Sequence, residues 1–171
     1  MHLAYVMNAE RGATDRLLSA LAERLAELGI ETAGIVQTNQ ETCDTELCDM
    51  DVKVLPDGET IRISQSLGKE SRGCRLNPEA LERAVALVQE RLNQTPAPQI
   101  LLVNKFGKHE ADGRGMRVVF AEALERGIPV ISGVNGVNVE AFHEFSGGIA
   151  EAAPQDVDGL VAWVQNCLEP A

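Results

Sequence analysis

Basic side chains gather in a few segments of an otherwise acidic chain. Of the 171 residues, 26 are acidic and 15 are basic, which gives a net charge of −11. Because crowded like charges are costly unless an anion lies among them, a cluster of these cations would form a binding site for a phosphate-like ligand. The alternative is that they are solvated surface charges, offset by Glu70, Glu110 and Asp112. The basic residues concerned are Arg11, Lys69, Arg72, Arg75, Lys105, Lys108, Arg114 and Arg117.

The elements that would position these side chains begin with a strand, a loop and a helix. Leu3 to Met7 is a short apolar run, and leucines then recur at helical spacing between Leu17 and Leu28. Gly29 ends this helix, and Ile30 to Gln37 predicts a second buried strand. Crossovers between parallel strands are almost always right-handed, so the loops after both strands lie at the same edge of the sheet. Loops at this edge are where α/β folds bind ligands, which favours the anion site over solvated charges.

The rest of the chain continues the α/β pattern. Asp51 to Leu55 and Thr60 to Ser64 alternate around Pro56-Asp57-Gly58-Glu59 and predict a β-hairpin. Asn77-Pro78 begins a helix that runs to about Asn93. The remaining predicted elements are a strand at Ile100 to Val103, a helix from about Arg114 to Arg126, a strand at Pro129 to Val134 and a helix at Asp156 to Leu168. We therefore predict an α/β fold of three layers, a mainly parallel sheet flanked by helices with a β-hairpin insertion, in a single domain over residues 1–171.

This order of elements resembles the small nucleoside-triphosphatase family of P-loop proteins. The likeness rests on the Gly12-Ala13-Thr14 loop before the first helix, the Ala33-Gly34-Ile35-Val36 strand and the segment from Leu102 to Glu110. In that family the first loop carries a Gly-Lys-Thr phosphate cradle, and the later strand ends in an Asp-Glu pair. The resemblance implies a P-loop NTPase-like fold and a nucleotide with Mg²⁺ as the ligands.

The chain departs from that family at the positions that carry the chemistry. Ala13 stands where the lysine belongs, and Asn104 and Lys105 occupy the Asp-Glu positions. The acidic magnesium partner and the water-orienting carboxylate are therefore both missing from their usual places. Lys105 can instead pair directly with an oxyanion. We therefore expect a degenerate P-loop-like domain that binds a nucleotide or another oxyanion without efficient hydrolysis.

A closer resemblance is to the uncharacterised bacterial family called domain of unknown function 2478. It rests on Arg62-Ile63-Ser64-Gln65, on Arg72-Gly73-Cys74-Arg75-Leu76 and on the segment from Asn104 to Gly115. Members of that family are often encoded beside molybdate-transport genes. The resemblance therefore implies a link to molybdenum handling, with an oxyanion such as phosphate or molybdate as the ligand.

The candidate ligand-binding residues come from loops that we expect to converge beside the first helix. The free N–H groups and the dipole at the amino end of that helix favour an anion. No catalytic residue and no metal site is identified. The anion- or nucleotide-binding set is Asn8, Arg11, Gly12, Ala13, Thr14, Arg72, Arg75, Asn104, Lys105, Lys108 and Arg114.

Two other functions stay open. The chain could be an active magnesium-dependent nucleoside triphosphatase in which Arg11 or Lys105 replaces the usual lysine. Glu10, Asp15 or Glu110 would then hold the magnesium ion. The chain could also be a non-enzymatic interaction module whose cationic loops dock an acidic protein.

Cysteine and histidine residues offer weaker candidates. Cys43, Cys48 and Cys74 could bind zinc, but no second close pair or nearby histidine completes a tetrahedral set. They could equally be ordinary small residues, with Cys43 and Cys48 as a redox-sensitive pair. His109 lies beside Glu110 and could take part in acid–base chemistry.

Charge and composition exclude several classes of partner. An acidic surface repels nucleic acid and anionic membranes. Four cysteines are too few for a disulfide scaffold, and Met1 to Met7 lacks a charged leader with a long apolar core. We therefore expect a cytoplasmic protein that binds a small anionic ligand but neither nucleic acid nor membrane, with homo-oligomer formation left open.

Overall fold

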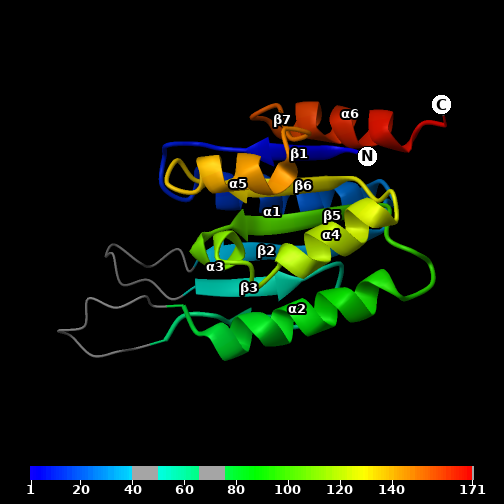
Figure 1. Ribbon diagram of the computed structural model, residues 1–171. Helices are drawn as coiled ribbons and strands as arrows, with labels where there is room; N and C mark the ends of the chain where they lie inside the picture. The colour runs from blue at the N-terminus through cyan, green and yellow to red at the C-terminus, as the bar shows by residue number, and fades with distance from the viewer. Residues whose placement is uncertain (40–49, 66–75, 171) are drawn as a thin grey trace.

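A seven-stranded sheet in the order β4-β3-β2-β5-β6-β1-β7 forms the centre of the computed structural model, which describes residues 1–39, 50–65 and 76–170 (Figure 1). The strands are β1 (Leu3–Val6), β2 (Thr32–Asn39), β3 (Met50–Val54), β4 (Thr60–Arg62), β5 (Ile100–Phe106), β6 (Val130–Val134) and β7 (Glu151–Ala152). The helices are α1 (Ala13–Glu27), α2 (Pro78–Leu92), α3 (Lys108–Ala111), α4 (Arg117–Glu125), α5 (Val139–Ser146) and α6 (Val157–Leu168).

The sheet is mainly parallel, as the sequence predicts. β2 pairs in parallel with β5, β5 with β6, β6 with β1, and β1 with β7. β3 and β4 add the predicted antiparallel hairpin at one edge, next to β2. Because parallel strands point the same way, the chain leaves β1, β5 and β6 at one edge of the sheet, which lies at the left in Figure 1. We call this the carboxyl edge.

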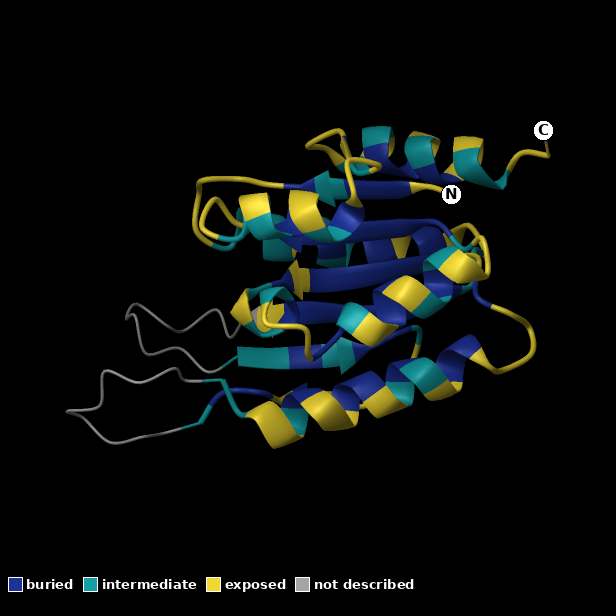
Figure 2. Cartoon of the chain, in the orientation of Figure 1, coloured by how far each residue is buried: buried dark blue, intermediate teal, exposed yellow. Residues whose placement is uncertain are grey.

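Helices cover both faces of the sheet, which gives the predicted three layers. Alternate residues of β5 point to opposite faces, since Leu101 and Val103 belong to one buried cluster and Ile100 and Leu102 to the other. The first cluster includes apolar residues of α2, α4 and α5, and the second includes those of α1 and α6. The strands are accordingly buried between helices whose outer faces are exposed (Figure 2).

Gly34 permits the close pairing of β2 with β5. It lies opposite Leu102 in the parallel register and has a φ of 117°. A Cβ atom at this position would lie 1.8 Å from the carbonyl oxygen of Leu102. Only glycine fits such a contact, so this position determines how closely β2 and β5 can approach each other.

The predicted helix from Arg114 to Arg126 is wrong at its start. The structure has two helices here, α3 and then α4, which begins at Arg117. Gly113 and Gly115 separate them with φ values of 88° and 62°, a left-handed conformation that interrupts a right-handed helix. The short strand β7 and the helix α5 are further elements that the sequence patterns did not predict.

The helix starting at Pro78 is confirmed. The Oδ1 atom of Asn77 accepts hydrogen bonds from the backbone N–H groups of Glu79 and Ala80, at 3.1 and 3.3 Å, and thereby caps α2. Within the described ranges, none of the helices has the length and apolar character needed to cross a membrane.

Candidate functional site

Three elements meet at the carboxyl edge around Asn104. This residue lies near the end of β5, and its Nδ2 atom donates a hydrogen bond of 3.0 Å to Oδ1 of Asp15, in the first turn of α1. Gly133 of β6 lies beside both elements, because a Cβ atom added there would be 2.8 Å from Cγ2 of Thr14 and 3.3 Å from Oδ1 of Asn104. The end of β5 and the start of α1 are therefore in direct contact, as the prediction of a shared ligand-binding edge requires.

The side-chain oxygen of Asn104 is buried without a partner. Only 2% of the residue is exposed, and Oδ1 accepts no hydrogen bond from any described residue. An unsatisfied buried acceptor costs on the order of 1–3 kcal/mol. Such groups are rare in proteins and concentrate where a water molecule, an ion or a ligand completes the site. The Asn104 oxygen therefore marks this edge as a place where a donor group is needed.

The loop between β1 and α1 is organised by local hydrogen bonds. Oδ1 of Asn8 accepts a hydrogen bond of 2.9 Å from the backbone N–H of Glu10, as in an Asx turn. The Glu10 carboxylate accepts a 2.8 Å charged hydrogen bond from Arg16, and both side chains are exposed. Gly12 precedes α1 with a φ of 75°, and none of the described side chains caps this end of the helix. The N–H of Ala13 donates to the backbone oxygen of Glu10 at 3.2 Å, and the next N–H group of α1, that of Thr14, has no acceptor among the described residues and is left for a ligand.

Four of the predicted residues line one pocket of about 620 Å³ on the α2 side of β5. We call it the Lys105 pocket. One wall is polar and comes from the end of β5 and the segment around α3, and the other is largely apolar and comes from β2, the hairpin and α2. The pocket is lined by Ile35, Gln37, Met50, Ile63, Gln65, Leu76, Pro78, Leu81, Asn104, Lys105, Gly107, Lys108, His109, Glu110, Asp112 and Arg114.

The remaining predicted residues do not line this pocket. Arg11 is exposed, and the loop residues Asn8, Arg11 and Gly12 and the first residues of α1, Ala13 and Thr14, contribute nothing to its described walls. That loop lies on the α1 side of Asn104, so Asn104 is the residue common to the loop and the pocket. The other predicted cations and the three candidate zinc ligands lie outside the described residues: Lys69, Arg72, Arg75, Cys43, Cys48 and Cys74.

Positive charge in the Lys105 pocket is only partly neutralised. Lys105 and Lys108 are exposed, and neither forms an ion pair with another described residue. Arg114 lies 3.8 Å from the carboxylate of Asp112, and both of these side chains face solvent. Two lysine ammonium groups therefore remain to attract an anion.

Glu110 has a structural role that its sequence position does not reveal. Its carboxylate is 3% exposed and accepts hydrogen bonds of 3.0 Å from the backbone N–H groups of Gly107 and Met116. It thereby ties together the segment from Gly107 to Met116, which carries Lys108 and directly follows the end of β5. The Glu110 charge is stabilised by these donors rather than by a ligand.

The proposed acid–base pair of His109 and Glu110 does not fit this geometry. His109 is directed to a different carboxylate, with its Nε2 atom 3.6 Å from Oε1 of Glu82. Arg117 likewise does not join the predicted cluster of cations. Its guanidinium donates to the backbone oxygen of Glu110 at 3.3 Å and lies 4.9 Å above the centre of the Phe145 ring.

The carboxylates considered for magnesium are each engaged elsewhere. Glu10 pairs with Arg16, Asp15 accepts from Asn104, and Glu110 binds backbone N–H groups. In the described part of the chain, no three His, Cys, Asp or Glu side chains are grouped closely enough to hold a metal ion. The magnesium alternative would therefore need some of these contacts to break.

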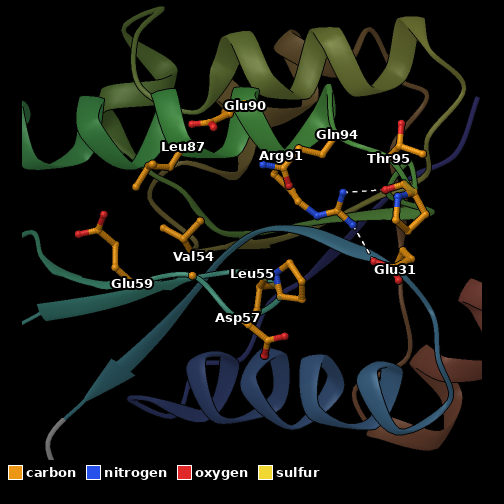
Figure 3. Close-up of a pocket in the computed structure, with 13 residues that line it drawn as sticks. Glu31, Val54, Leu55, Asp57, Glu59, Leu87, Glu90, Arg91, Gln94 and Thr95 are labelled. Carbon is orange, nitrogen blue, oxygen red and sulfur yellow. Dashed lines mark hydrogen bonds and ion pairs between the residues drawn. The ribbon is translucent and has the colours of Figure 1, made fainter.

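A second pocket, of about 520 Å³, lies at the opposite edge of the sheet (Figure 3). Its central cation, Arg91, is 7% exposed and is satisfied by the carboxylate of Glu31 at 2.7 Å and by the backbone oxygen of Pro96 at 2.8 Å. Asp57, Glu59 and Glu90 add further carboxylates to the lining of this pocket. An anion would be repelled here, so the Lys105 pocket is the better candidate.

The apolar wall of the Lys105 pocket was not identified from the sequence. Ile35, Ile63 and Leu81 are buried core residues whose pattern predicts only that they face inward. They meet at one pocket because the hairpin extends the sheet beside β2 and α2 packs on that face of the sheet. Gln37, 7% exposed at the end of β2, was also missed, although a glutamine inside an apolar strand is a usable signal.

The fold defined by these elements is that of the P-loop nucleoside triphosphatases. A solved structure described as that of a human cancer-related nucleoside triphosphatase superposes with a TM-score of 0.68, covering 98% of this chain and 99% of that one at 15% sequence identity. The chain belongs to the family described as protein of unknown function (DUF2478), which matches residues 3–163.

The amino-acid sequence is also similar to that of a named protein. This relative is the molybdenum import ATP-binding protein ModC 2 of Bradyrhizobium diazoefficiens, which is 34% identical to this chain over 151 residues. The match covers 87% of this chain but only 16% of the length of that protein.

Proposed function

We propose that residues 1–171 form a single domain that binds a nucleotide or another oxyanion at the carboxyl edge and does not hydrolyse triphosphates efficiently. The observation that carries this proposal is the pair Asn104 and Lys105 at the end of β5, in contact with the first turn of α1. A neutral amide and an ammonium group that pairs with no described carboxylate stand where hydrolysis would need two carboxylates.

The charge distribution supports direct binding of an anion. The protein carries a net charge of −11, yet Lys105, Lys108 and Arg114 surround one pocket. The amino end of α1 contributes N–H groups and a positive helix dipole on the other side of Asn104. A phosphate-like group between the two would meet positive potential from both directions.

The absence of a lysine and of carboxylates at the catalytic positions supports the second half of the proposal. Ala13 has no charge with which to stabilise a transferring phosphoryl group. Asp15 is held by the Asn104 amide, so a metal ion would have to displace that contact. Slow or absent turnover is the expected consequence.

The description of the relative suggests which ligands to test first. That protein is described as an ATP-binding protein for molybdenum import, so we propose ATP and molybdate as the first ligands to test and a role in cytoplasmic molybdenum handling. Molybdate and phosphate are both tetrahedral oxyanions, and lysine side chains can bind either through charge-assisted hydrogen bonds.

Calorimetry at low salt with ATP, GTP, phosphate and molybdate tests the proposal. We expect binding of at least one of them, and a loss of affinity of about tenfold in Lys105→Ala, as for a charge-assisted hydrogen bond of about 1–3 kcal/mol. Lys53→Ala is the matched control, because it removes the same charge from β3, outside the pocket. No heat and no thermal shift with any of the four anions would contradict the proposal.

Phosphate release with Mg²⁺ and ATP or GTP tests the absence of hydrolysis. We expect no release above a blank without protein. Release that requires Mg²⁺ and disappears in Thr14→Ala would favour the active triphosphatase instead.

A further inference from the structure

We propose that the Lys105 pocket binds an organic anion with an apolar body, and that this ligand occupies a compartment separate from the loop around Gly12. This inference rests on the proposed function, because it assumes that Lys105 and Lys108 attract an anionic group. It adds the chemical class of the molecule that carries that group.

The two walls of the pocket differ in chemistry. Lys105 and Lys108 lie on the wall formed by β5 and α3. The facing wall is formed by aliphatic side chains and one methionine: Ile35, Met50, Ile63, Leu76 and Leu81. A ligand that spans the pocket must therefore be charged at one end and apolar at the other.

The size of the pocket supports an organic ligand over an inorganic ion. Its volume of about 620 Å³ is about twenty times the 30 Å³ that one water molecule takes up in the liquid. Phosphate or molybdate alone would fill a small part of that space and leave the aliphatic wall in contact with water. Pockets of about 300–1,000 Å³ are typical of sites for organic molecules.

One buried polar side chain can help to orient such a ligand. Gln37 is 7% exposed and contributes its amide to the lining of the pocket. Asn104 also lines the pocket, but its buried Oδ1 atom lies where Gly133 faces Thr14 and Leu18 of α1, so that oxygen serves the α1 side of the edge. The anionic head group of the ligand is bound by the lysines.

The pocket is separate from the loop that precedes α1. None of the described residues that line it comes from the segment between β1 and α1. Asn104 connects the two places, because it lines the pocket and also donates to Asp15 of α1. The geometry therefore allows one anion at the start of α1 and an organic anion in the Lys105 pocket at the same time.

Three matched probes test this inference by calorimetry: 1-naphthyl phosphate, inorganic phosphate and 1-naphthol. We expect 1-naphthyl phosphate to bind at least about tenfold more tightly than either of the others, since burial of a ring adds to the charge contacts. Lys105→Ala should weaken binding of both phosphates by about tenfold and leave 1-naphthol unchanged.

Substitutions in the apolar wall test this inference without testing the proposed function. Met50→Gln and Leu76→Gln alter half-buried positions of the wall. Each should lower the affinity for 1-naphthyl phosphate by about fivefold and leave the affinity for inorganic phosphate unchanged. Leu28→Gln is the control, because it removes an exposed leucine after the far end of α1. Circular dichroism of each variant checks that the fold is retained.

The outcomes are distinguishable. If inorganic phosphate binds through Lys105 but 1-naphthyl phosphate binds no more tightly, the inference is overturned and the proposed function stands. If neither phosphate binds, this inference is overturned, whereas the proposed function fails only if ATP, GTP and molybdate also give no heat. If 1-naphthol binds as tightly as its phosphate and Lys105→Ala changes nothing, the pocket takes neutral apolar molecules and the inference is also overturned.

Discussion

The Nδ2 atom of Asn104 donates a 3.0 Å hydrogen bond to the carboxylate of Asp15, so the end of the central strand β5 is tied directly to the first turn of α1. Asp15 is also an acidic residue at the positive end of the α1 dipole, a position that stabilises its charge. The contact therefore holds β5 and α1 together at the edge where we propose that an anion binds. One partner, Asn104, is neutral, and the other, Asp15, is charged.

Replacing this amide with a second carboxylate should destabilise the protein. Asn104→Asp would remove the donor and bring two negative groups to hydrogen-bond distance in a largely buried place. We expect the free energy of unfolding at neutral pH to fall by about 1–3 kcal/mol, measured by urea denaturation.

The reversed pair is the control for that change. In the double variant Asp15→Asn with Asn104→Asp, an amide can again donate to a carboxylate, now in the opposite direction. The double variant should regain most of the free energy of unfolding that the single variant loses. If the single and double variants are equally unstable, repulsion between the two positions is not the cause.

Gly133 should not tolerate a side chain. A Cβ atom there would lie 2.8 Å from Cγ2 of Thr14 and 3.3 Å from Oδ1 of Asn104, so Gly133→Ala forces α1 away from the sheet. We expect a loss of about 1–3 kcal/mol in thermal or urea unfolding, together with weaker anion binding. Gly136→Ala is the matched control, because nothing lies within 4 Å of its added Cβ atom. Equal stability of the two variants would contradict the close packing described here.

The main elements of the fold follow from local signals in the sequence. The leucines of α1, the Asn77-Pro78 cap of α2 and the apolar run of β5 each specify one element by themselves. The start of α4 does not, because the predicted start, Arg114, lies between Gly113 and Gly115, whose left-handed conformations interrupt a right-handed helix. Sequence alone does not state which glycines adopt that conformation.

The candidate site was predictable only in part for a similar reason. Asn104, Lys105 and Lys108 directly follow or end an apolar strand, so the topology rule for parallel sheets places them at the ligand edge. The aliphatic wall, from residues such as Ile63 and Leu81, depends on how the hairpin and α2 pack together. Contacts between segments far apart in the chain carry no local pattern.

The Glu110 carboxylate should be required for the shape of the Lys105 pocket. Glu110→Gln replaces one of its two acceptor oxygens with a donor, which cannot accept from both Gly107 and Met116. We expect a loss of about 1–3 kcal/mol in the free energy of unfolding and faster hydrogen exchange at residues 107–116. Asp112→Asn changes an exposed carboxylate of the same segment and should have little effect. Unchanged exchange in Glu110→Gln would contradict the role assigned to this residue.

Cys167 in α6 should react slowly with alkylating agents in the folded protein. Burial raises the pKa of its thiol above 9.0, and the nearby negative charge of Glu151 raises the pKa further, while the chain's amino terminus lowers it. Since the thiolate is the reactive form, alkylation with iodoacetamide at pH 8.5 should be slower at Cys167 than in the urea-unfolded chain, as read by peptide mass spectrometry.

The direction of the pKa shift of Cys167 also determines how this thiol's contribution to stability changes with pH. Because the pKa of Cys167 is raised by folding, its contribution to stability is full below the pKa of the unfolded chain and is lost as the pH rises through the higher pKa of the folded state. Glu151→Gln separates the two causes, since glutamine can still accept the hydrogen bond from Nε1 of Trp163 but carries no charge. Alkylation of Cys167 should then become faster without reaching the rate of the unfolded chain, because burial remains. A rate that does not change would mean that burial alone protects the thiol.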